Sequence, residues 1–291
     1  MGVKLAALAV IAAVAAASCA AATRSAPVTE TRSVPRFSHV ILIVFENHEV
    51  GEVLGNSGAP TFNRLASRYS TISQYTAVAH PSLPNYLALV SGSTQGIDSD
   101  CTTCLVDGRN LADTLGAAGK TWKTYAEGLP YTGFTGASSG RYAKKHNPLV
   151  YFRRNLTPAR LGRIVPLSGF LSDVRGRRLP AFSLVVPDLC HDMHDCGVAT
   201  GDTWLGAFLR PLLRGSVLRN SAVFVVFDEG TTDVGGGGRV AALALGPLVR
   251  PHARSTAATN HYGLRRTIEA GLGLPLLGRS AGARPIVGIW R

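Results

Sequence analysis

The stretch His39-Val-Ile-Leu-Ile-Val-Phe-Glu-Asn-His48 decides the fold of this chain. Its six consecutive apolar residues, Val40 to Phe45, are mostly β-branched. Such a run predicts a strand that is buried on both faces, as in a parallel sheet covered by helices. Glu46 and Asn47 follow at its carboxyl end, where open α/β sheets bind their ligands. The stretch therefore predicts an α/β fold with a functional site at the end of this strand.

A second stretch repeats this arrangement. Ser221-Ala-Val-Phe-Val-Val-Phe-Asp-Glu-Gly230 is another apolar run, and it ends in Asp228 and Glu229. Two buried strands that each end in a pair of oxygen-bearing side chains indicate a divalent cation held between them. The alternative is that these carboxylates cap helices or face solvent, and two matching pairs argue against it.

Length, composition and charge fit one large domain. The 291 residues can bury a substantial core, and 46% hydrophobic with 16% charged residues exclude global disorder. The net charge of +12 comes mostly from dispersed arginines, without a block of like charges or alternating aromatic residues, so no specific nucleic-acid partner is predicted. The positive charge indicates either a solvated surface or attraction of phosphate-bearing substrates and anionic cell-surface polymers.

The N-terminus has the organisation of a secretory signal. Lys4 precedes an apolar run over residues 5–17, and Ala20-Ala-Ala22 is a cleavage site of the small-residue type. We expect a signal peptide over residues 1–22, a flexible Ser/Thr/Pro-rich tether over 23–36 and a single domain over 37–291. Ala17-Ser-Cys19 loosely resembles a lipoprotein processing site, so a lipid anchor at Cys19 is the alternative to release. An uncleaved membrane anchor is disfavoured because the apolar run is barely long enough to span a bilayer. The protein is thus predicted to be secreted or attached to the cell envelope.

Export favours disulfides as the interpretation of the cysteines. With Cys19 set aside, four remain in two local pairs, Cys101/Cys104 and Cys190/Cys196. In an oxidising compartment both pairs are expected to form disulfides, since a single Cys-x-x-Cys is poor spacing for a zinc site. Each bridge closes a short loop and is expected to hold local geometry.

The pattern after the first strand predicts a helix over 60–69, a short polar strand over 70–75 and a helix from Ser82 to a C-capping Gly92. A serine at a helix N-terminus is either a plain N-cap or a nucleophile, and both interpretations stay open for Ser82. A helix over 111–119 and a strand over 121–126 precede a long loop over 128–147. Such loops usually shape access to a site.

A third buried strand is expected over 181–187. The segment after it, Asp188-Leu-Cys-His-Asp-Met-His-Asp-Cys196, is the densest cluster of titratable groups in the chain, with His191, Asp192, His194 and Asp195 between two cysteines. At the end of a core strand this segment is predicted to aim side chains at a site. Beyond it we expect an amphipathic helix over 204–213, a further strand over 240–245, and a helix with His261 in its first turn.

These groups together favour phosphoryl transfer to serine followed by hydrolysis. A hard cation with carboxylate ligands lowers the pKa of a coordinated serine hydroxyl and neutralises the oxygens of a phosphoryl group. The helix N-terminus at Ser82 adds partial positive charge where an anion would bind. Nearby histidines can bind phosphate oxygens, complete a second metal site or protonate the leaving alcohol. The candidates for these roles are His80, His191, His194 and His261.

The motifs also resemble those of the phosphoesterase family, which holds bacterial acid phosphatases and phospholipase C-type enzymes within the alkaline phosphatase superfamily. The resemblance covers about residues 37–275 in the family's order. It is carried by Phe-Glu-Asn-His at 45–48, His80-Pro-Ser-Leu-Pro-Asn-Tyr86, the segment 187–196, Phe227-Asp-Glu-Gly230 and Asn260-His-Tyr262.

The resemblance implies a three-layer α/β sandwich with a mostly parallel central sheet, one or two divalent cations, and a small phosphomonoester substrate. It implies Glu46, Asn47, Asp228 and Glu229 as metal ligands, with Ser82 as both ligand and nucleophile. His191, His194 and His261 would contact phosphate or a second metal, without a decision between the two loop histidines, and Asn47 and His80 are further candidates for contacting the substrate. A phospholipase C-type phosphodiesterase is the alternative, disfavoured because the chain has no room for the extra C-terminal domains of those members.

Three other interpretations compete with this one. A metal-free serine hydrolase would use Ser82 with His191 or His261, but no Gly-x-Ser-x-Gly surrounds Ser82 and the acidic pairs would have no role. A sulfatase-like reaction usually needs its own modified cysteine or serine motif, which is absent from the sequence. A tethered, non-catalytic binding protein would leave every reactive position without a purpose.

Overall fold

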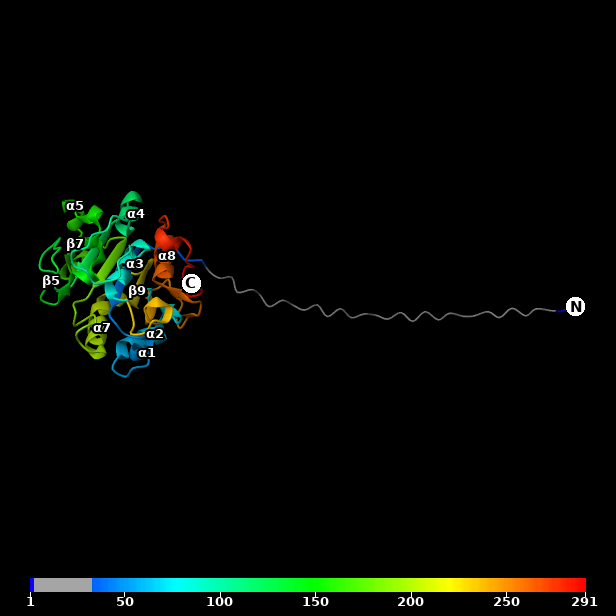
Figure 1. Cartoon of the computed structure of the whole chain (residues 1–291). Coiled ribbons are helices and arrows are strands. Elements are labelled where there is room, and N and C mark those ends of the chain that lie inside the picture. The colour runs from blue at the N-terminus through cyan, green and yellow to red at the C-terminus, as the bar shows by residue number, and fades with distance from the viewer. Residues whose placement is uncertain (3–32) are drawn as a thin grey trace. The chain divides into compact units, whose positions relative to one another are not determined.

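The structure is a computed structural model that describes residues 1–2 and 33–291 (Figure 1). Residues Thr31–Arg291 form one compact unit. The predicted signal peptide, the anchor residue Cys19 and most of the predicted tether lie outside the described residues. Within the described residues, no helix combines the length and the apolar character needed to cross a bilayer.

One large, mostly parallel sheet forms the centre of the domain, as predicted. Its strand order is β11-β2-β10-β9-β1-β8-β4-β7, and β10 is its antiparallel strand, running against β9 and β2. The strands are β1 (His39–Phe45), β2 (Ser70–Ile72), β4 (Trp122–Ala126), β7 (Ile164–Pro166), β8 (Phe182–Val186), β9 (Ser221–Phe227), β10 (Ala242–Leu245) and β11 (Arg254–Ser255).

The two strands that acidic pairs follow in the sequence, β1 and β9, are direct neighbours in the sheet. β1 and β9 pair in parallel from His39 opposite Ser221 to Phe45 opposite Phe227. Residues 40–45 and 221–227 are buried, since each strand has neighbours on both sides and helices on both faces. This register brings the residues that follow Phe45 and Phe227 to the same place at the carboxyl edge of the sheet.

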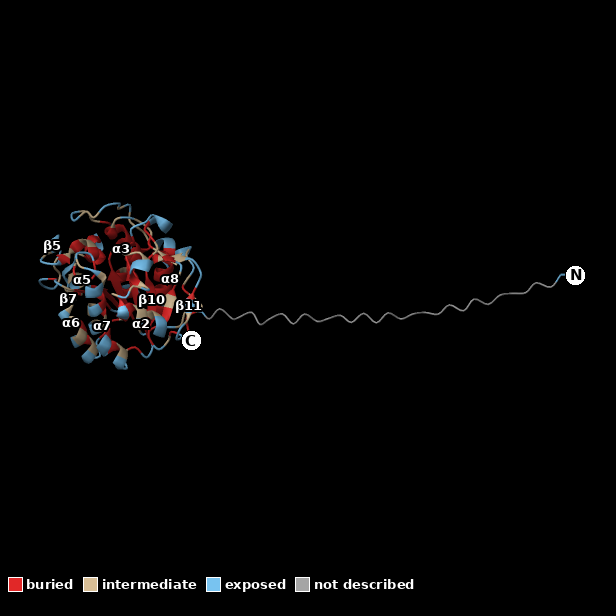
Figure 2. Ribbon diagram, turned by 90° about the horizontal axis from the view of Figure 1, so that it is seen from below, coloured by how far each residue is buried: buried red, intermediate tan, exposed pale blue. Residues whose placement is uncertain are grey.

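Helices cover both faces of the sheet and make a three-layer sandwich. On one face α3 (Ser82–Ser91) packs against α8 (His261–Leu272), and on the other α2 (Pro60–Arg68) packs against α7 (Val198–Arg214), with α6 (Ser168–Arg175) beside α7 through Phe170 and Phe208. Figure 2 shows buried residues in the strands and on the inner sides of these helices, and exposed residues on the outer sides of α2, α6 and α7. The shorter helices are α1 (Val50–Val53), α4 (Leu111–Ala117) and α5 (Pro158–Leu161).

Three segments differ from the sequence prediction. The helix expected over 204–213 begins earlier, as α7 (Val198–Arg214). The strand expected over 70–75 divides into β2 and β3 (Tyr75–Thr76), and β3 leaves the main sheet to pair with β12 (Thr259–Asn260). The loop expected over 128–147 contains a small hairpin and a 3₁₀ turn. These elements are β5 (Ser138–Ser139), β6 (Tyr142–Ala143) and η1 (Lys144–His146), followed by η2 (Pro148–Tyr151) and η3 (Arg153–Asn155), and η4 (Val234–Gly236) and η5 (Gly278–Ala281) lie later in the chain. Hydrophobic periodicity carries no signal for such short pieces, because two to four residues are too few to show a repeat.

Both predicted cysteine pairs form disulfides, Cys101–Cys104 and Cys190–Cys196. The first lies beside Asp100, whose carboxylate accepts the Leu83 N–H at the start of α3 at 2.9 Å. The second closes the loop that follows β8. Both bridges therefore fix loops at the carboxyl edge of the sheet.

Candidate active site

Three carboxylates and one hydroxyl meet at the carboxyl ends of β1 and β9. Glu46 and Asp228 are fully buried, and Glu229 is nearly so. The Ser82 hydroxyl lies 3.0 Å from Glu46 Oε2 and 3.2 Å from Glu229 Oε1, within hydrogen-bond distance of both acceptors. The register of the two strands thus places Ser82 between acidic groups that are about 180 residues apart in the sequence.

The position of Ser82 bears on the two interpretations of this residue. Pro81 is the N-cap of α3 and Ser82 is its first helical residue, while the Asp100 carboxylate accepts the Leu83 N–H. The Ser82 hydroxyl is therefore not needed as a cap. It faces the carboxylates, as a nucleophile at this place would.

Two buried oxygens beside these groups lack hydrogen-bond partners among the described residues. Asn47 adopts a left-handed backbone conformation (φ 54°), which asparagine tolerates, and its N–H donates to Asp228 Oδ1 at 3.3 Å. Its side-chain Oδ1 and the Asp228 Oδ2 atom are the unpartnered oxygens. Buried polar atoms are usually paired, and a hard cation is a partner that satisfies several oxygens at once.

The electrostatics also fit a cation. Burial raises the pKa of Asp228 well above its ordinary value, and the nearby charges of Glu46 and Glu229 raise it further. Burial likewise raises the pKa of Glu229. Carboxylates crowded in a buried site repel one another unless positive charge is placed among them. The predicted ligands Glu46, Asn47, Asp228, Glu229 and Ser82 therefore gather at one place as oxygen donors of the kind that a divalent metal ion prefers. In the part of the chain that the structure describes, Glu46, Asp228 and Glu229 do not together reach metal-ligand spacing, so this assignment stays a prediction.

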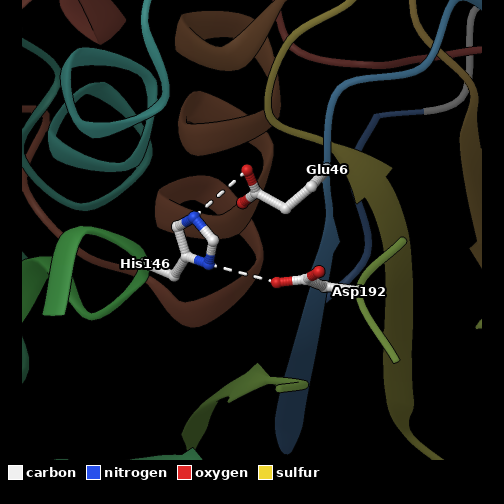
Figure 3. Close-up of side chains that lie close together, drawn as sticks. All are labelled: Glu46, His146 and Asp192. Atoms are coloured by element: carbon white, nitrogen blue, oxygen red, sulfur yellow. Dashed lines mark ion pairs between the residues drawn. The ribbon is translucent and has the colours of Figure 1, made fainter. Parts of the chain in front are cut away.

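A buried histidine that the sequence prediction missed completes one side of the cluster. His146 from η1 lies between two carboxylates, with its Nε2 3.2 Å from Glu46 Oε2 and its Nδ1 3.1 Å from Asp192 Oδ2 (Figure 3). Burial alone would lower the pKa of His146, but Glu46 and Asp192 raise it to about 9. Burial would raise the pKa of Glu46, but the charge and contact of His146, the Tyr86 hydroxyl and the charge of Lys145 together lower it. Glu46, His146 and Asp192 are also close enough together to hold a metal ion.

Tyr86 supports the other side of Glu46. Its hydroxyl donates to Glu46 Oε1, and its ring stacks on the His146 ring with centroids 5.3 Å apart. Tyr86 follows Ser82 by four residues on α3, so the two side chains share one face of the helix. That spacing is the signal in the sequence that could have predicted Tyr86 as a residue of the site.

The other predicted histidines occupy different positions around the cluster. His80 contacts Glu229 Oε2 through Nδ1 and the Thr232 carbonyl through Nε2 at 3.1 Å. His261 is buried with its Nε2–H donated to the Asp228 carbonyl at 2.6 Å and its Nδ1 accepting from the Tyr75 hydroxyl at 2.8 Å. Burial lowers the pKa of His261 to about 4, so this ring is neutral and positions the backbone of Asp228.

The two histidines of the disulfide-closed loop separate from each other. His194 lies beside the cluster, with its ring centroid 5.7 Å from that of His146 and its Nε2 3.2 Å from Lys145 Nζ. His191 lies farther along the loop, with its Nδ1 2.9 Å from Glu127 Oε2 and its ring stacked on Trp204. Glu127, Asp188 and His191 form a second group with metal-ligand spacing, but Asp188 Oδ1 already accepts the backbone N–H groups of Cys190 and His191.

Lys145 links this loop to the start of α3. Its ammonium group lies 2.9 Å from Asp100 Oδ2, and the same Asp100 accepts the Leu83 N–H. Burial would lower the pKa of Lys145, but Asp100, Glu46 and Asp228 raise it above its ordinary value. The charged Lys145 and the protonated His146 therefore add positive charge to an acidic site, as binding of a phosphate group requires.

Comparison with known proteins shows the family of this chain. The model of the phosphoesterase family matches residues 52–275. The chain belongs to the phosphoesterase family. A protein named phosphatidylinositol-3-phosphatase from Mycobacterium tuberculosis is 37% identical over 89% of this chain and 84% of the relative. A probable acid phosphatase from Kluyveromyces lactis is 31% identical over 91% of this chain, which spans 65% of that relative.

Solved structures agree on the fold. A protein in the alkaline phosphatase superfamily from Vibrio parahaemolyticus superposes with a TM-score of 0.60 at 14% identity, over 87% of this chain and 71% of that protein. The predicted family and fold class are therefore confirmed, and so is the predicted enzyme class, a hydrolase of phosphoric esters. The predicted metal ligands and catalytic residues stay predictions.

Proposed function

We propose that the chain is an exported, metal-dependent phosphomonoesterase of the acid phosphatase type that acts through a phosphoserine intermediate on Ser82. The observation that carries the proposal is the Ser82 hydroxyl held between the carboxylates of Glu46 and Glu229 at the carboxyl edge of the sheet. A serine with no structural hydrogen bond to the backbone, placed among buried acids, is arranged for chemistry and not for stability.

The residues divide into a metal-holding group and a substrate-handling group. Glu46, Asn47, Asp228, Glu229 and Ser82 would hold a divalent cation, whose chemistry is to lower the pKa of the serine hydroxyl and to neutralise phosphoryl oxygens. The unpartnered oxygens of Asn47 and Asp228 support this assignment. His146 and Tyr86 orient the Glu46 carboxylate, since each contacts one of its oxygens.

The reaction would proceed in two displacements. Ser82 Oγ attacks phosphorus as its proton passes to the Glu229 carboxylate, which His80 contacts on the other oxygen. The bond between phosphorus and the ester oxygen breaks, and the alcohol leaves with a proton. Water then attacks the phosphoserine, which releases inorganic phosphate and restores Ser82.

We assign protonation of the leaving alcohol to His194. Its ring lies beside His146 and Lys145, whereas His191 is held away by Glu127 and Trp204. Lys145 carries the positive charge nearest to His194 and would bind a non-bridging phosphate oxygen. His191 remains a candidate for contact with a larger leaving group.

The experiment is a phosphoester panel on the wild-type chain, Ser82→Ala and Ser91→Ala. Ser91 is the matched control because it is a buried serine of the same helix whose hydroxyl bonds only to backbone carbonyls and the Gln95 amide. The panel holds an aryl phosphate, an aryl phosphodiester, an aryl carboxylate ester and phosphatidylinositol 3-phosphate, the last suggested by the name of one relative.

Turnover of monoesters is expected for the wild type and Ser91→Ala and should fall at least 10³-fold for Ser82→Ala. Acid-quenched reactions with ³²P-labelled substrate should label the wild-type chain at Ser82. Retained turnover in Ser82→Ala would move the nucleophile elsewhere. Preference for the diester would favour the phospholipase C-type alternative, and preference for the carboxylate ester would favour a serine hydrolase.

Export is the part of the proposal that rests on the N-terminal sequence and the cysteines. The two disulfides fit a protein that folds in an oxidising compartment. Mass spectrometry of the protein from the culture medium and from the membrane fraction distinguishes the two processing routes. A chain that begins near residue 23 indicates cleavage and release, and a lipid-modified Cys19 indicates anchoring to the cell envelope.

A further inference from the structure

Two clefts flank α7. The first lies between α2 and α7, runs along both helices and has a volume of about 510 Å³. The second has a volume of about 440 Å³, and residues just before or at the starts of β1 and β9, Ser38, His39 and Asn220, line it. Both lie beside the last turns of α7, since Arg214 lines the first cleft and Gly215 the second.

Arginines dominate the lining of both clefts. Arg64 and Arg68 follow one another at helical spacing on α2, and Arg210 and Arg214 do so on α7 across the first cleft. Three more line the second cleft. We call the set the arginine surface: Arg64, Arg68, Arg175, Arg177, Arg210, Arg214 and Arg219, all exposed.

The arginine surface has almost no acidic counterpart. Asp202 is the acidic residue among the lining residues of the two clefts, and it is buried with its carboxylate accepting the backbone N–H groups of Thr61 and Phe62. Within residues 33–291, no arginine of this surface forms an ion pair with a carboxylate. Seven guanidinium groups that repel one another without compensation indicate an external anion.

Apolar side chains lie among these arginines. Leu213 and Val217, at the end of α7 and just after it, are only partly buried, and Pro211 is exposed. Apolar residues flanked by arginines are typical of protein surfaces that rest in the headgroup region of a bilayer, where the apolar groups enter and the cations remain with the phosphates. A soluble anion would bind through the arginine charges alone and would need no apolar contact.

The chain itself reaches the domain at this end. Ser38, which lines the second cleft, immediately precedes β1, and Cys19, the residue of the alternative lipid anchor, lies 19 residues before it in the sequence. A lipid anchor at Cys19 would bring this end of the domain to the membrane. We propose that the arginine surface binds the anionic headgroups of a lipid bilayer.

The proposal gives the domain an orientation on the bilayer. β1 runs from the arginine surface to Glu46 over seven residues, which is about 23 Å at the usual rise of a strand. The active site therefore faces away from the lipid and toward soluble phosphomonoesters. The binding surface is independent of the proposed catalytic function, and its test uses no turnover.

The experiment is vesicle sedimentation with the full chain. The probes are phosphatidylcholine vesicles and phosphatidylcholine vesicles with 40% phosphatidylglycerol, at low and at physiological salt. The test variant changes Arg64, Arg68, Arg210 and Arg214 to glutamine. The control variant changes four exposed arginines outside both clefts in the same way, Arg141, Arg154, Arg254 and Arg284, so that the net charge falls from +12 to +8 in both. All variants retain the same N-terminal segment, and a double variant, Arg210→Gln/Arg214→Gln, serves if the quadruple variant unfolds.

Each arginine near an anionic leaflet strengthens partitioning by about fivefold, so binding to anionic vesicles should fall about 25-fold in the double variant and about 600-fold in the quadruple variant. The control variant should lose less than threefold, and added salt should weaken wild-type binding. Equal losses in the test and control variants would reduce the effect to net charge and overturn the proposal. Equal wild-type binding to neutral vesicles, or binding of dextran sulfate in place of vesicles, would overturn it as well.

Discussion

Replacement of Tyr86 by phenylalanine tests whether the support of Glu46 matters for the metal site. The Tyr86 hydroxyl is the donor to Glu46 Oε1, while Glu46 Oε2 contacts Ser82 and His146. A hydrogen bond to a charged group contributes about 1.5–3 kcal/mol, and groups that orient a metal ligand typically change metal affinity by about 10–100-fold. The two figures agree, because each 1.4 kcal/mol is about tenfold in an equilibrium constant. The stacking of the ring on His146 is retained in phenylalanine.

The assay is turnover of an aryl phosphate as a function of added divalent cation after chelation, together with thermal unfolding. Tyr86→Phe should need about 10–100-fold more cation for half-maximal activity and recover most of the wild-type rate at saturation. Tyr125→Phe is the matched control, because the Tyr125 hydroxyl donates to the Asp173 carboxylate at 2.8 Å, away from the site. An unchanged cation requirement in Tyr86→Phe, with a fall in Tm like that of the control, would refute the role of this hydroxyl and leave it a purely structural bond.

Three further predictions follow from the same contacts. Prolonged chelation should abolish turnover while the far-UV circular dichroism spectrum persists, and a divalent cation should restore it; turnover that survives in protein shown by elemental analysis to be metal-free would contradict the donor set at Glu46. His146→Gln should lower kcat at least tenfold and lower the free energy of unfolding by about 3 kcal/mol, since it leaves the buried carboxylates of Glu46 and Asp192 without their positive partner; a fully active variant would show that the histidine is dispensable. Burial would raise the pKa of Asp173, but Lys123 and Tyr125 lower it overall, so its ion pair stabilises the fold above pH about 4 and the contribution is lost as pH falls below that value. Asp173→Asn should therefore be less stable than the wild type at pH 7, by about 1 kcal/mol, with a difference that shrinks in chemical denaturation as the pH falls below about 4; a difference that stays constant as the pH falls would rule out the ion pair as its source.

The part of the site that lies on regular strands and helices was predictable from the sequence. The runs before Glu46 and Asp228 are long and apolar enough to identify two core strands, and parallel neighbours bring their carboxyl ends together. The helix from Ser82 to Gly92 was predicted correctly because proline near its start and glycine at its end punctuate it.

The part that lies on irregular segments was not predictable in the same way. His146 stands in a 3₁₀ turn after a long loop, where no periodicity tells which side chain points inward. Its partners come from the ends of β1 and of the loop after β8, at sequence separations of about 100 and 46 residues. Asp192 was recognised as part of a cluster, but its burial against His146 depends on contacts that only the folded chain supplies. Tyr86 is intermediate, since helical spacing connects it to Ser82 but nothing in the sequence connects it to Glu46.

The parallel pairing of β1 with β9 has a consequence for any attempt to redesign the molecule. Because side chains alternate between the two faces of a sheet, a slip of one residue between these strands would turn Glu46 and Asp228 toward opposite faces. The alignment is maintained by interlocking aliphatic and aromatic groups along the whole length of both strands. A change in the size of one of those interior groups is therefore expected to alter ion affinity as well as stability.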